Sequence, residues 1–250
     1  MTKSFDYIMD IGEQMLVSGA EVHRAEESMN RMFRALGASR VDVFIITSSI
    51  VVTIHTEDGD TYTQTRRITS SNMDYERLHR LNQLSREICT KNLSEQEIQE
   101  KLTAAISNKK YPLWLEMVAY SIIAGAFTLF FGGNAVETIY SLGVGCVVWV
   151  VSLFFDNIIS NKIFSKFLST VIATALAFMA VAFGWIANVD KVMIGNIMTL
   201  IPGIGLTNAI RDLFTGDSMA GLLRTIEALL IALAIAAGYF LVAFLGGFAA

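Results

Sequence analysis

The sequence predicts a membrane bundle of about five transmembrane α-helices preceded by a small α+β domain. Two observations support this fold class: charged residues are concentrated before residue 110, and long apolar stretches occupy the rest. The last 140 residues contain only 5 of the 19 Lys and Arg and 7 of the 23 Asp and Glu. A soluble domain of that size would lack the charge to cover its surface, whereas a surface in lipid has to be apolar. We therefore expect one domain at 1–110 and a transmembrane domain at 111–250.

Residues 1–110 combine helical and strand patterns. Apolar residues such as Ile8, Met15 and Met29 recur at three- and four-residue spacing, which predicts one long amphipathic helix over 5–36. The segments that follow predict three strands near 41–46, 50–55 and 61–68, a turn at 57–60, and two helices that begin after Asp74 and after Ser94, the second with Glu97 in a capping box. Together these elements predict a small α+β unit.

The apolar region predicts five crossings, each with about the 20 residues needed to span the hydrocarbon core. They lie near 113–131, 135–155, 167–187, 192–210 and 225–245. With the amino-terminal domain inside, only Lys191 lies outside, and the other basic residues of this region are cytoplasmic. Those residues are Lys109, Lys110, Lys162, Lys166, Arg211 and Arg224. The sequence thus predicts a multi-pass protein of the plasma membrane with a cytoplasmic amino-terminal domain.

The crossing at 192–210 contains Pro202, which Gly203 and Gly205 follow. Proline removes a backbone donor and glycine weakens a helix, so we expect this crossing to be broken or kinked. Transporters use such breaks to direct half-helix ends toward a substrate or ion. The polar side chains expected beside the break are Asn196, Thr199, Thr207 and Asn208. The alternative is a purely structural kink.

Acidic residues at the predicted spans are candidates for proton coupling, because a charge deep in the bilayer usually faces a cavity or a partner. Glu116 and Glu227 fit this role as well as they fit an interfacial position. For Glu137 the expected position is interfacial, in contact with headgroup water.

Glu26 falls on the apolar stripe of the first predicted helix. A carboxylate there needs a cation, and we expect Arg66 or Arg67 of the third strand to supply it. His23 with Glu26 gives too few ligands for a metal site. The sequence therefore predicts no metal and no cofactor.

Other function classes find no support in the sequence. A net charge of −4 offers no basis for nucleic-acid binding. Cys89 and Cys146 have neither metal-ligand nor redox spacing. No nucleophile elbow accompanies the three histidines, so we expect no hydrolase and no enzyme.

Three groups of residues together resemble the threonine/serine exporter family, and they extend over almost the whole chain. They are Gly12 with Ser18-Gly-Ala-Glu-Val-His-Arg24 and Glu26; Thr65-Arg-Arg-Ile-Thr69 with Asn72, Leu78, Leu81 and Asn82; and Ile201-Pro-Gly-Ile-Gly-Leu-Thr-Asn-Ala-Ile-Arg-Asp-Leu213 with Gly216 and Asp217. The resemblance implies a cytoplasmic domain followed by membrane helices.

The chain departs from the fused members of that family, which carry about ten spans. It is similar to the split branch, in which a subunit like this one works with a small membrane protein of about four or five spans. That branch includes an exporter associated with succinate. The resemblance implies a transport path at the Pro202 region with Asn208, Arg211 and Asp212, and a separate role for Arg24, Glu26 and Arg67.

The leading hypothesis is a secondary exporter subunit for threonine or serine, with succinate as the alternative substrate. Coupling to the proton gradient is expected because no ATP-binding motif is present. The expected partners are the lipid bilayer, the small membrane subunit and, as an open alternative, further copies of this chain. A hypothesis of another class is a membrane-anchored ligand-binding or sensor module, in which the α+β domain is the working part.

Overall fold

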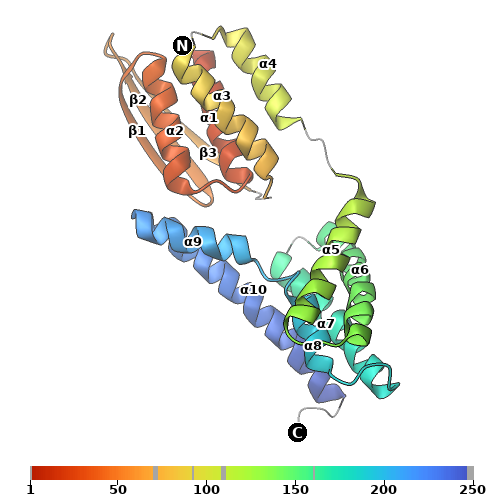
Figure 1. The fold of residues 1–250 in the computed structure, drawn as a ribbon. Coiled ribbons are helices and arrows are strands. Elements are labelled where there is room, and N and C mark those ends of the chain that lie inside the picture. Colours follow the sequence, from red (N-terminus) through yellow and green to blue (C-terminus); the bar gives the residue numbers. More distant parts are fainter. Residues whose placement is uncertain (1, 70–72, 92, 108–110, 160, 247–250) are drawn as a thin grey trace. The chain divides into compact units, whose positions relative to one another are not determined.

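The computed structural model of this chain describes residues 2–69, 73–91, 93–107, 111–159 and 161–246 (Figure 1). Asn72, Lys109 and Lys110, which the sequence analysis used, lie outside the described residues. The chain forms two compact units. The first unit comprises Met1–Lys109 and Ile204–Thr225, and the second comprises Lys110–Gly203 and Ile226–Ala250.

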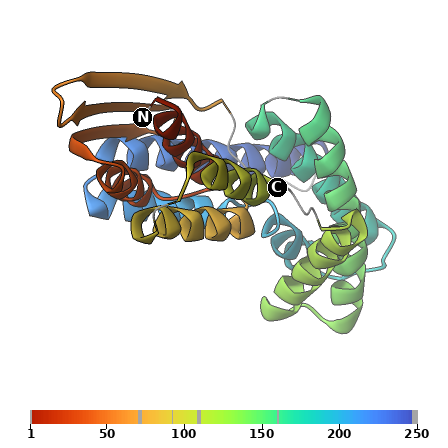
Figure 2. The same ribbon diagram turned by 90° about the horizontal axis from the view of Figure 1, so that it is seen from above.

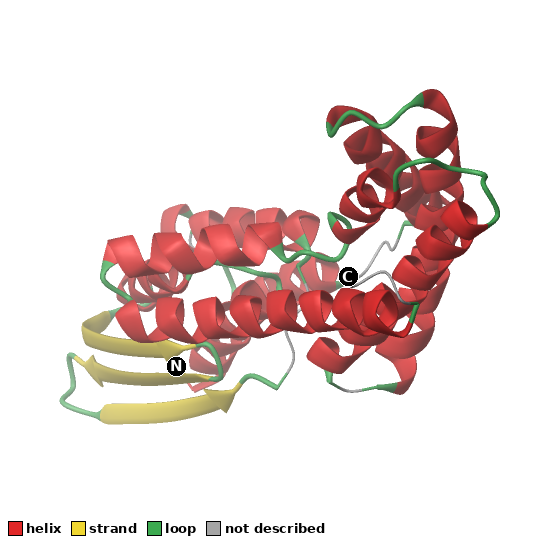
Figure 3. Cartoon of the chain, turned by 90° about the horizontal axis from the view of Figure 1, so that it is seen from below, coloured by secondary structure: helices red, strands yellow, loops and turns green. Residues whose placement is uncertain are grey.

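The first unit contains an antiparallel sheet in the order β1-β2-β3. Its strands are β1 (Ala38–Ile46), β2 (Ser49–Thr56) and β3 (Thr61–Arg67). Burial alternates along β2, because successive side chains point to opposite faces of a strand. The helices of this unit lie on one face of the sheet (Figures 2 and 3). The three predicted strands are therefore confirmed, and Gly59 makes the predicted turn with a φ of +89°.

Four helices, within the described residues, precede the second unit. They are α1 (Thr2–Val17), α2 (Val22–Ala35), α3 (Tyr75–Thr90) and α4 (Glu95–Ile106). The prediction of one helix over 5–36 is wrong, because the chain turns between Val17 and Val22, and Gly19 adopts a φ of +93° there. The apolar spacing continues across the turn because α1 and α2 contribute to the same core, with Ile8 and Met29 fully buried.

The predicted helix caps are confirmed. The Asp74 side chain accepts a hydrogen bond from the Arg77 backbone N–H at 2.9 Å. Ser94 and Glu97 form the predicted capping box at the start of α4, so two amides that have no partner within the helix are bonded there.

The predicted cation partner of Glu26 is wrong. Glu26 Oε1 instead accepts a hydrogen bond from the Ile45 backbone N–H at 2.9 Å. This is possible because β1 is an edge strand and has ladder partners on one side only. Burial raises the pKa of the Glu26 carboxyl. Arg66 faces α1, where it pairs with Asp10 at 3.3 Å, and Arg67 is exposed.

Among the residues that the structure describes, four helices are long and apolar enough to cross a membrane. They are α5 (Leu113–Phe130), α6 (Ala135–Ile158), α7 (Lys162–Ala182) and α10 (Ser218–Leu245). These helices carry many exposed large apolar side chains, which a lipid environment would cover. Four of the five predicted crossings thus correspond to single helices, with ends shifted by several residues in α7 and α10.

The remaining predicted crossing, the fourth in chain order at 192–210, is not a continuous helix. α8 (Val189–Ile197) belongs to the second unit, and α9 (Gly203–Thr215) begins directly after Pro202 and belongs mainly to the first. The interruption lies where proline and glycine predicted it. α8 packs against α5, α6 and α7, so its polar groups are shielded by protein.

Glu137 is buried within the second unit, so its side chain does not make the predicted contact with headgroup water. Its carboxylate caps α6 by accepting from the Asn134 backbone N–H, and it accepts from both the backbone and the side-chain N–H of Asn188 at 2.9 Å. These bonds satisfy the buried charge and tie the start of α6 to the residue before α8.

Close backbone contact holds α5 against α8. A Cβ added at Gly195 would lie 2.1 Å from Thr128 Oγ1 and 2.5 Å from the Ala124 carbonyl oxygen, closer than real contacts permit. Thr128 Oγ1 in turn lies 2.7 Å from Ser141 Oγ, which accepts from Asn196 Nδ2 at 2.9 Å. Glycine at 195 thus lets a buried polar cluster form between α5, α6 and α8.

We expect Gly195→Ala to destabilise the second unit by about 1–3 kcal/mol, the usual cost of overpacking. Gly143→Ala is the matched control, because a Cβ added at Gly143 on α6 meets nothing within 4 Å. Thermal unfolding of the detergent-purified full chain measures both variants. Equal unfolding midpoints for the two variants would contradict the close packing of α8.

Candidate functional site

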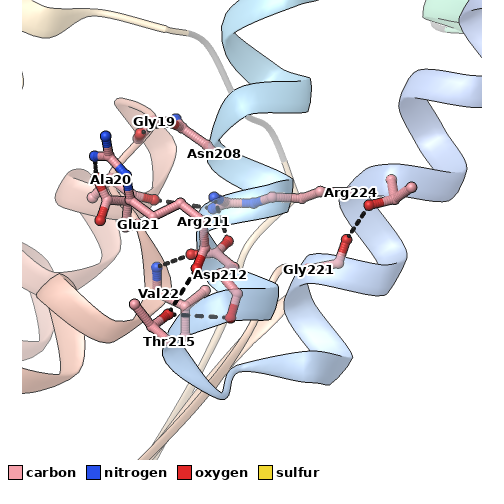
Figure 4. Close-up of polar contacts among 11 residues, drawn as sticks. Gly19, Ala20, Glu21, Val22, Asn208, Arg211, Asp212, Thr215, Gly221 and Arg224 are labelled. Atoms are coloured by element: carbon pink, nitrogen blue, oxygen red, sulfur yellow. Dashed lines mark hydrogen bonds and ion pairs between the residues drawn. The ribbon is translucent and has the colours of Figure 1, made fainter.

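The turn between α1 and α2 meets α9 and the start of α10 within the first unit (Figure 4). Asp212 of α9 is fully buried. Its Oδ1 accepts a hydrogen bond from the backbone N–H of Val22, the first residue of α2, at 3.3 Å. Its Oδ2 pairs with Arg224 Nη1 of α10 at 2.8 Å. One carboxylate therefore bonds both a helix N-terminus and a guanidinium.

The carbonyl groups of the same turn are also bonded. Arg224 Nη2 donates to the Ala20 carbonyl at 3.0 Å, and Asn208 Nδ2 donates to the Gly19 carbonyl at 3.3 Å. Arg211 forms an ion pair with Glu21. We call this set of contacts the turn–hairpin junction. It satisfies backbone groups that the turn itself leaves unpaired.

Two opposing effects act on the Asp212 carboxyl. Burial raises its pKa above the ordinary value, and the Arg224 guanidinium and the Val22 N–H counteract part of that rise. The positive end of α2 also favours a carboxylate at this position. Removal of either side chain would therefore leave the other charge without its ionic partner in a site that is largely shielded from water.

Glycines shape the hairpin of α9 and α10. Gly216 adopts a φ of +99°, a conformation that L side chains rarely take. A Cβ added at Gly221 would lie 2.8 Å from the Leu213 backbone nitrogen and 2.9 Å from the Ala209 carbonyl oxygen. The two helices therefore pack backbone to backbone, and this brings Arg224 beside Asp212.

A pocket of about 240 Å³ adjoins the junction within the first unit. Its polar lining comes from the α1–α2 turn, α2, α3 and α9, and consists of Glu21, Arg24, Asn82, Asn208 and Arg211. Met15, Gly19, Ala20, Tyr75 and Leu78 complete the lining. The pocket thus combines two guanidinium groups, one carboxylate and two amides, which suits a small ligand that carries charge.

Two of the polar lining groups have no protein partner in the part of the chain that the structure describes. The exposed Arg24 guanidinium makes no hydrogen bond or ion pair there, and neither does the Asn82 side-chain amide. Glu21 by contrast is bonded by Arg211 through Oε1. Arg24 therefore leaves the pocket with an uncompensated positive charge, which favours an anionic group of a ligand.

The structure brings together only part of the predicted substrate path. Asn208 and Arg211 line the pocket together with Arg24 of α2, and Asp212 lies at the adjoining junction. Gly203 and Gly205 lie in the first turns of α9. Asn196 and Thr199 are in the second unit, where Thr199 Oγ1 donates to the Asn196 carbonyl at 2.7 Å. Pro202 is the last residue of the interruption before α9.

The remaining predicted residues lie elsewhere. Glu116 and Glu227 are exposed on α5 and α10 in the second unit, and they stay candidates for proton coupling. Glu26, Arg66 and Arg67 do not line the pocket. The described residues contain no cluster of three or more His, Cys, Asp or Glu that could hold a metal ion.

Sequence reasoning gave no site role to Glu21, Tyr75, Asn82 and Arg224. Glu21 and Asn82 stand within the motif groups that carried the family resemblance, so a signal for them was present. Arg224 had no such signal, because its role depends on the packing of α10 against α9.

An apolar helical unit joined to a small α+β domain, with four helices of membrane-spanning length in the described residues, defines a multi-pass membrane protein. The family model described as "Putative threonine/serine exporter" matches residues 6–246. The chain belongs to the threonine/serine exporter family. This is a family of transporters, and the protein is therefore a membrane transport protein and not an enzyme.

Relatives of known name differ in length from this chain. It is 24% identical to "Probable succinate transporter subunit YjjP" of Klebsiella aerogenes over 90% of this chain and 86% of that protein. It is 23% identical to "Pheromone-regulated membrane protein 10" of Eremothecium gossypii over 96% of this chain but only 33% of that protein. It is 24% identical to "Probable threonine/serine exporter" of Mycobacterium tuberculosis over 94% of this chain and 45% of that protein. No solved structure matches the chain.

We expect Asp212→Ala to lower the stability of the first unit by about 3–5 kcal/mol, because it leaves Arg224 buried without its partner. Asp42→Ala is the control: Asp42 pairs with Arg40 at 2.9 Å on an exposed surface, where a pair contributes about 0–1 kcal/mol. Thermal unfolding of the full chain in detergent compares the two. In a double-mutant cycle, Asp212→Ala with Arg224→Ala is expected to cost less than the sum of the single changes. Strict additivity would contradict the pairing.

Proposed function

We propose that this chain is a subunit of a secondary exporter that moves small polar metabolites out of the cell, threonine or serine first, driven by the proton gradient. The observation that carries the proposal is the interruption between α8 and α9. The chain belongs to a family of transporters. The second half of the interrupted segment, α9, contributes Asn208 and Arg211 to a charged pocket. A purely structural kink would not require those side chains.

Chain connectivity supports a discontinuous fourth crossing. Residues 1–109 and 204–225 form one compact unit, so we place both on the same side of the membrane. Crossings by α5, α6 and α7 would leave the chain on the opposite side after Ala182. The chain then has to return before Ile204, through the stretch that contains α8. Because α8 has 9 residues and rises about 1.5 Å per residue, it covers about half of the ~30 Å core.

In transporters, discontinuous helices contribute to binding sites, because their half-helix ends are exposed to substrates and ions near the bilayer midplane. Irregular backbone at membrane depth is tolerated where protein covers it or where it lines a cavity. The packing of α8 against α5, α6 and α7 provides that cover.

The proposed partner is a small membrane subunit with about four or five spans. The threonine/serine exporter relative is more than twice as long as the matched region, whereas the relatives of similar length are called subunits. We place the protein in the plasma membrane with its amino-terminal domain in the cytoplasm. Assembly with further copies of this chain would be compatible with the presence of the small subunit and with its absence.

Succinate is the second candidate substrate, because two bacterial relatives of similar length bear the name of a succinate transporter subunit. The alternative of another class, a membrane-anchored sensor module, would use the pocket without transport. Measurement of the metabolites that cells release distinguishes both alternatives from the export of threonine or serine.

Cells lacking their own exporters are expected to release threonine and serine faster when they express this chain together with the proposed small membrane subunit. Dissipation of the proton gradient is expected to abolish the gain. Cells that express the Asp212→Ala chain are the control. Release of succinate alone would assign the second substrate, and no change in any of the three metabolites would contradict the proposed function.

Cysteine labelling tests the fourth crossing. In a Cys89→Ser/Cys146→Ala background, a membrane-impermeant maleimide is expected to label Ala187→Cys in intact cells. We expect Phe214→Cys and Asp58→Cys to react only after permeabilisation. All three positions are exposed in their own units. Labelling of Ala187→Cys and Phe214→Cys from the same side would contradict a crossing between them.

A further inference from the structure

We propose that the pocket between the α1–α2 turn, α3 and α9 binds a small α-amino acid as a zwitterion, with Arg24 holding its carboxylate and Glu21 its ammonium group. The inference rests on the proposed function and deepens it, because it assigns the substrate to a site formed by the first unit. The charges of the lining residues and the hydrogen-bonding groups that they offer to a ligand support this assignment.

Arg24 is suited to a ligand carboxylate. Its guanidinium lines the pocket and has no hydrogen-bond or ion-pair partner among the described residues. A guanidinium offers a planar pair of N–H donors that matches a carboxylate in bidentate geometry. The Asn82 amide, which is equally without a partner there, adds a donor and an acceptor on the α3 side of the pocket.

Glu21 is suited to a ligand ammonium group. Arg211 occupies its Oε1, and Oε2 has no partner in the described part of the chain. The side chain of Glu21 is only 14% exposed, so little water competes for the free oxygen. An ammonium group has three N–H donors and can bond Oε2. The ligand would thereby add a second positive charge beside a carboxylate that is paired with Arg211.

The remaining lining favours a small ligand with a short polar side chain. The volume of about 240 Å³ lies below the ~300–1,000 Å³ typical of sites for drug-sized ligands. Asn208 Nδ2 donates to the Gly19 carbonyl. Its side-chain oxygen has no partner among the described residues and can accept from a ligand hydroxyl. Met15 and Leu78 supply apolar contact for ligand carbon atoms.

A dicarboxylate fits this pocket less well. Its second carboxylate would need Arg211, which is engaged by Glu21. Binding would have to break that pair and place two like charges beside each other, which costs free energy in a partly desolvated site. The presence of both signs of charge in one small pocket is the feature that selects a zwitterion.

Equilibrium binding of radiolabelled L-threonine to the full chain in detergent tests the proposal. We expect Arg24→Gln and Glu21→Gln each to weaken binding at least tenfold. Arg34→Gln is the matched control, since Arg34 lies on the same helix, bonds Asn30 and does not line the pocket; its affinity is expected to equal that of the wild type. Thermal unfolding verifies that each variant is folded, and Arg24→Gln, at an exposed position, keeps the test decisive if Glu21→Gln does not fold.

Competition identifies the recognised groups. Unlabelled L-serine is expected to displace the label, whereas threonine amide, N-acetylthreonine and succinate are expected to compete at least tenfold less well. Stronger succinate binding to Glu21→Gln with no threonine binding to the wild type would overturn the zwitterion assignment. Threonine binding that is unaffected by either substitution would overturn the site. Export that persists in Arg24→Gln cells would refute this inference and leave the proposed function standing.

Discussion

A buried carboxylate with two partners joins the hairpin of α9 and α10 to the rest of the first unit. Asp212 bonds the N-terminus of α2 and pairs with Arg224, while Arg224 also bonds the Ala20 carbonyl. Both charges are shielded from water, so neither can lose its partner without a large cost in free energy. This constraint fixes α9 and the start of α10 against a turn that lies about 190 residues earlier in the chain, and the charged pocket adjoins that contact.

Physical constraints of the membrane explain which parts of the fold the sequence predicts. Segregation of charge and the length of apolar stretches are strong signals, because lipid excludes charge and sets the length of a crossing. The break at Pro202 is predicted for a comparable reason: the missing N–H is a local property. The turn at Gly19 is not predicted, since α1 and α2 bury the same stripe and the apolar period continues through the turn. The spacing of apolar residues indicates which side of a helix is buried. It does not indicate whether the chain turns back between two helices that bury the same side.

Pairings of charged residues were harder to predict, because they depend on the direction in which a side chain leaves its element. Glu26 was assigned to Arg66 or Arg67 by charge alone, yet a free amide of the edge strand satisfies it. Arg211 and Asp212 were assigned one transport role together. The structure separates them, because adjacent residues of a helix point in different directions: Arg211 reaches Glu21 at the pocket and Asp212 reaches the α2 N-terminus.

In the proposed exporter, a ligand of the pocket would have a physical means of influencing transport. Asn208 and Arg211 belong to α9, which continues directly from the interruption that ends at Pro202. A ligand that bonds both the α2 turn and α9 favours states in which these segments are in contact, by an amount equal to its difference in affinity between the states. An interrupted segment can change its backbone angles at the break at lower cost than a continuous helix, since few intrahelical bonds have to be broken there. In the proposed exporter, the pocket would therefore be connected along the chain, through α9, to the break at Pro202.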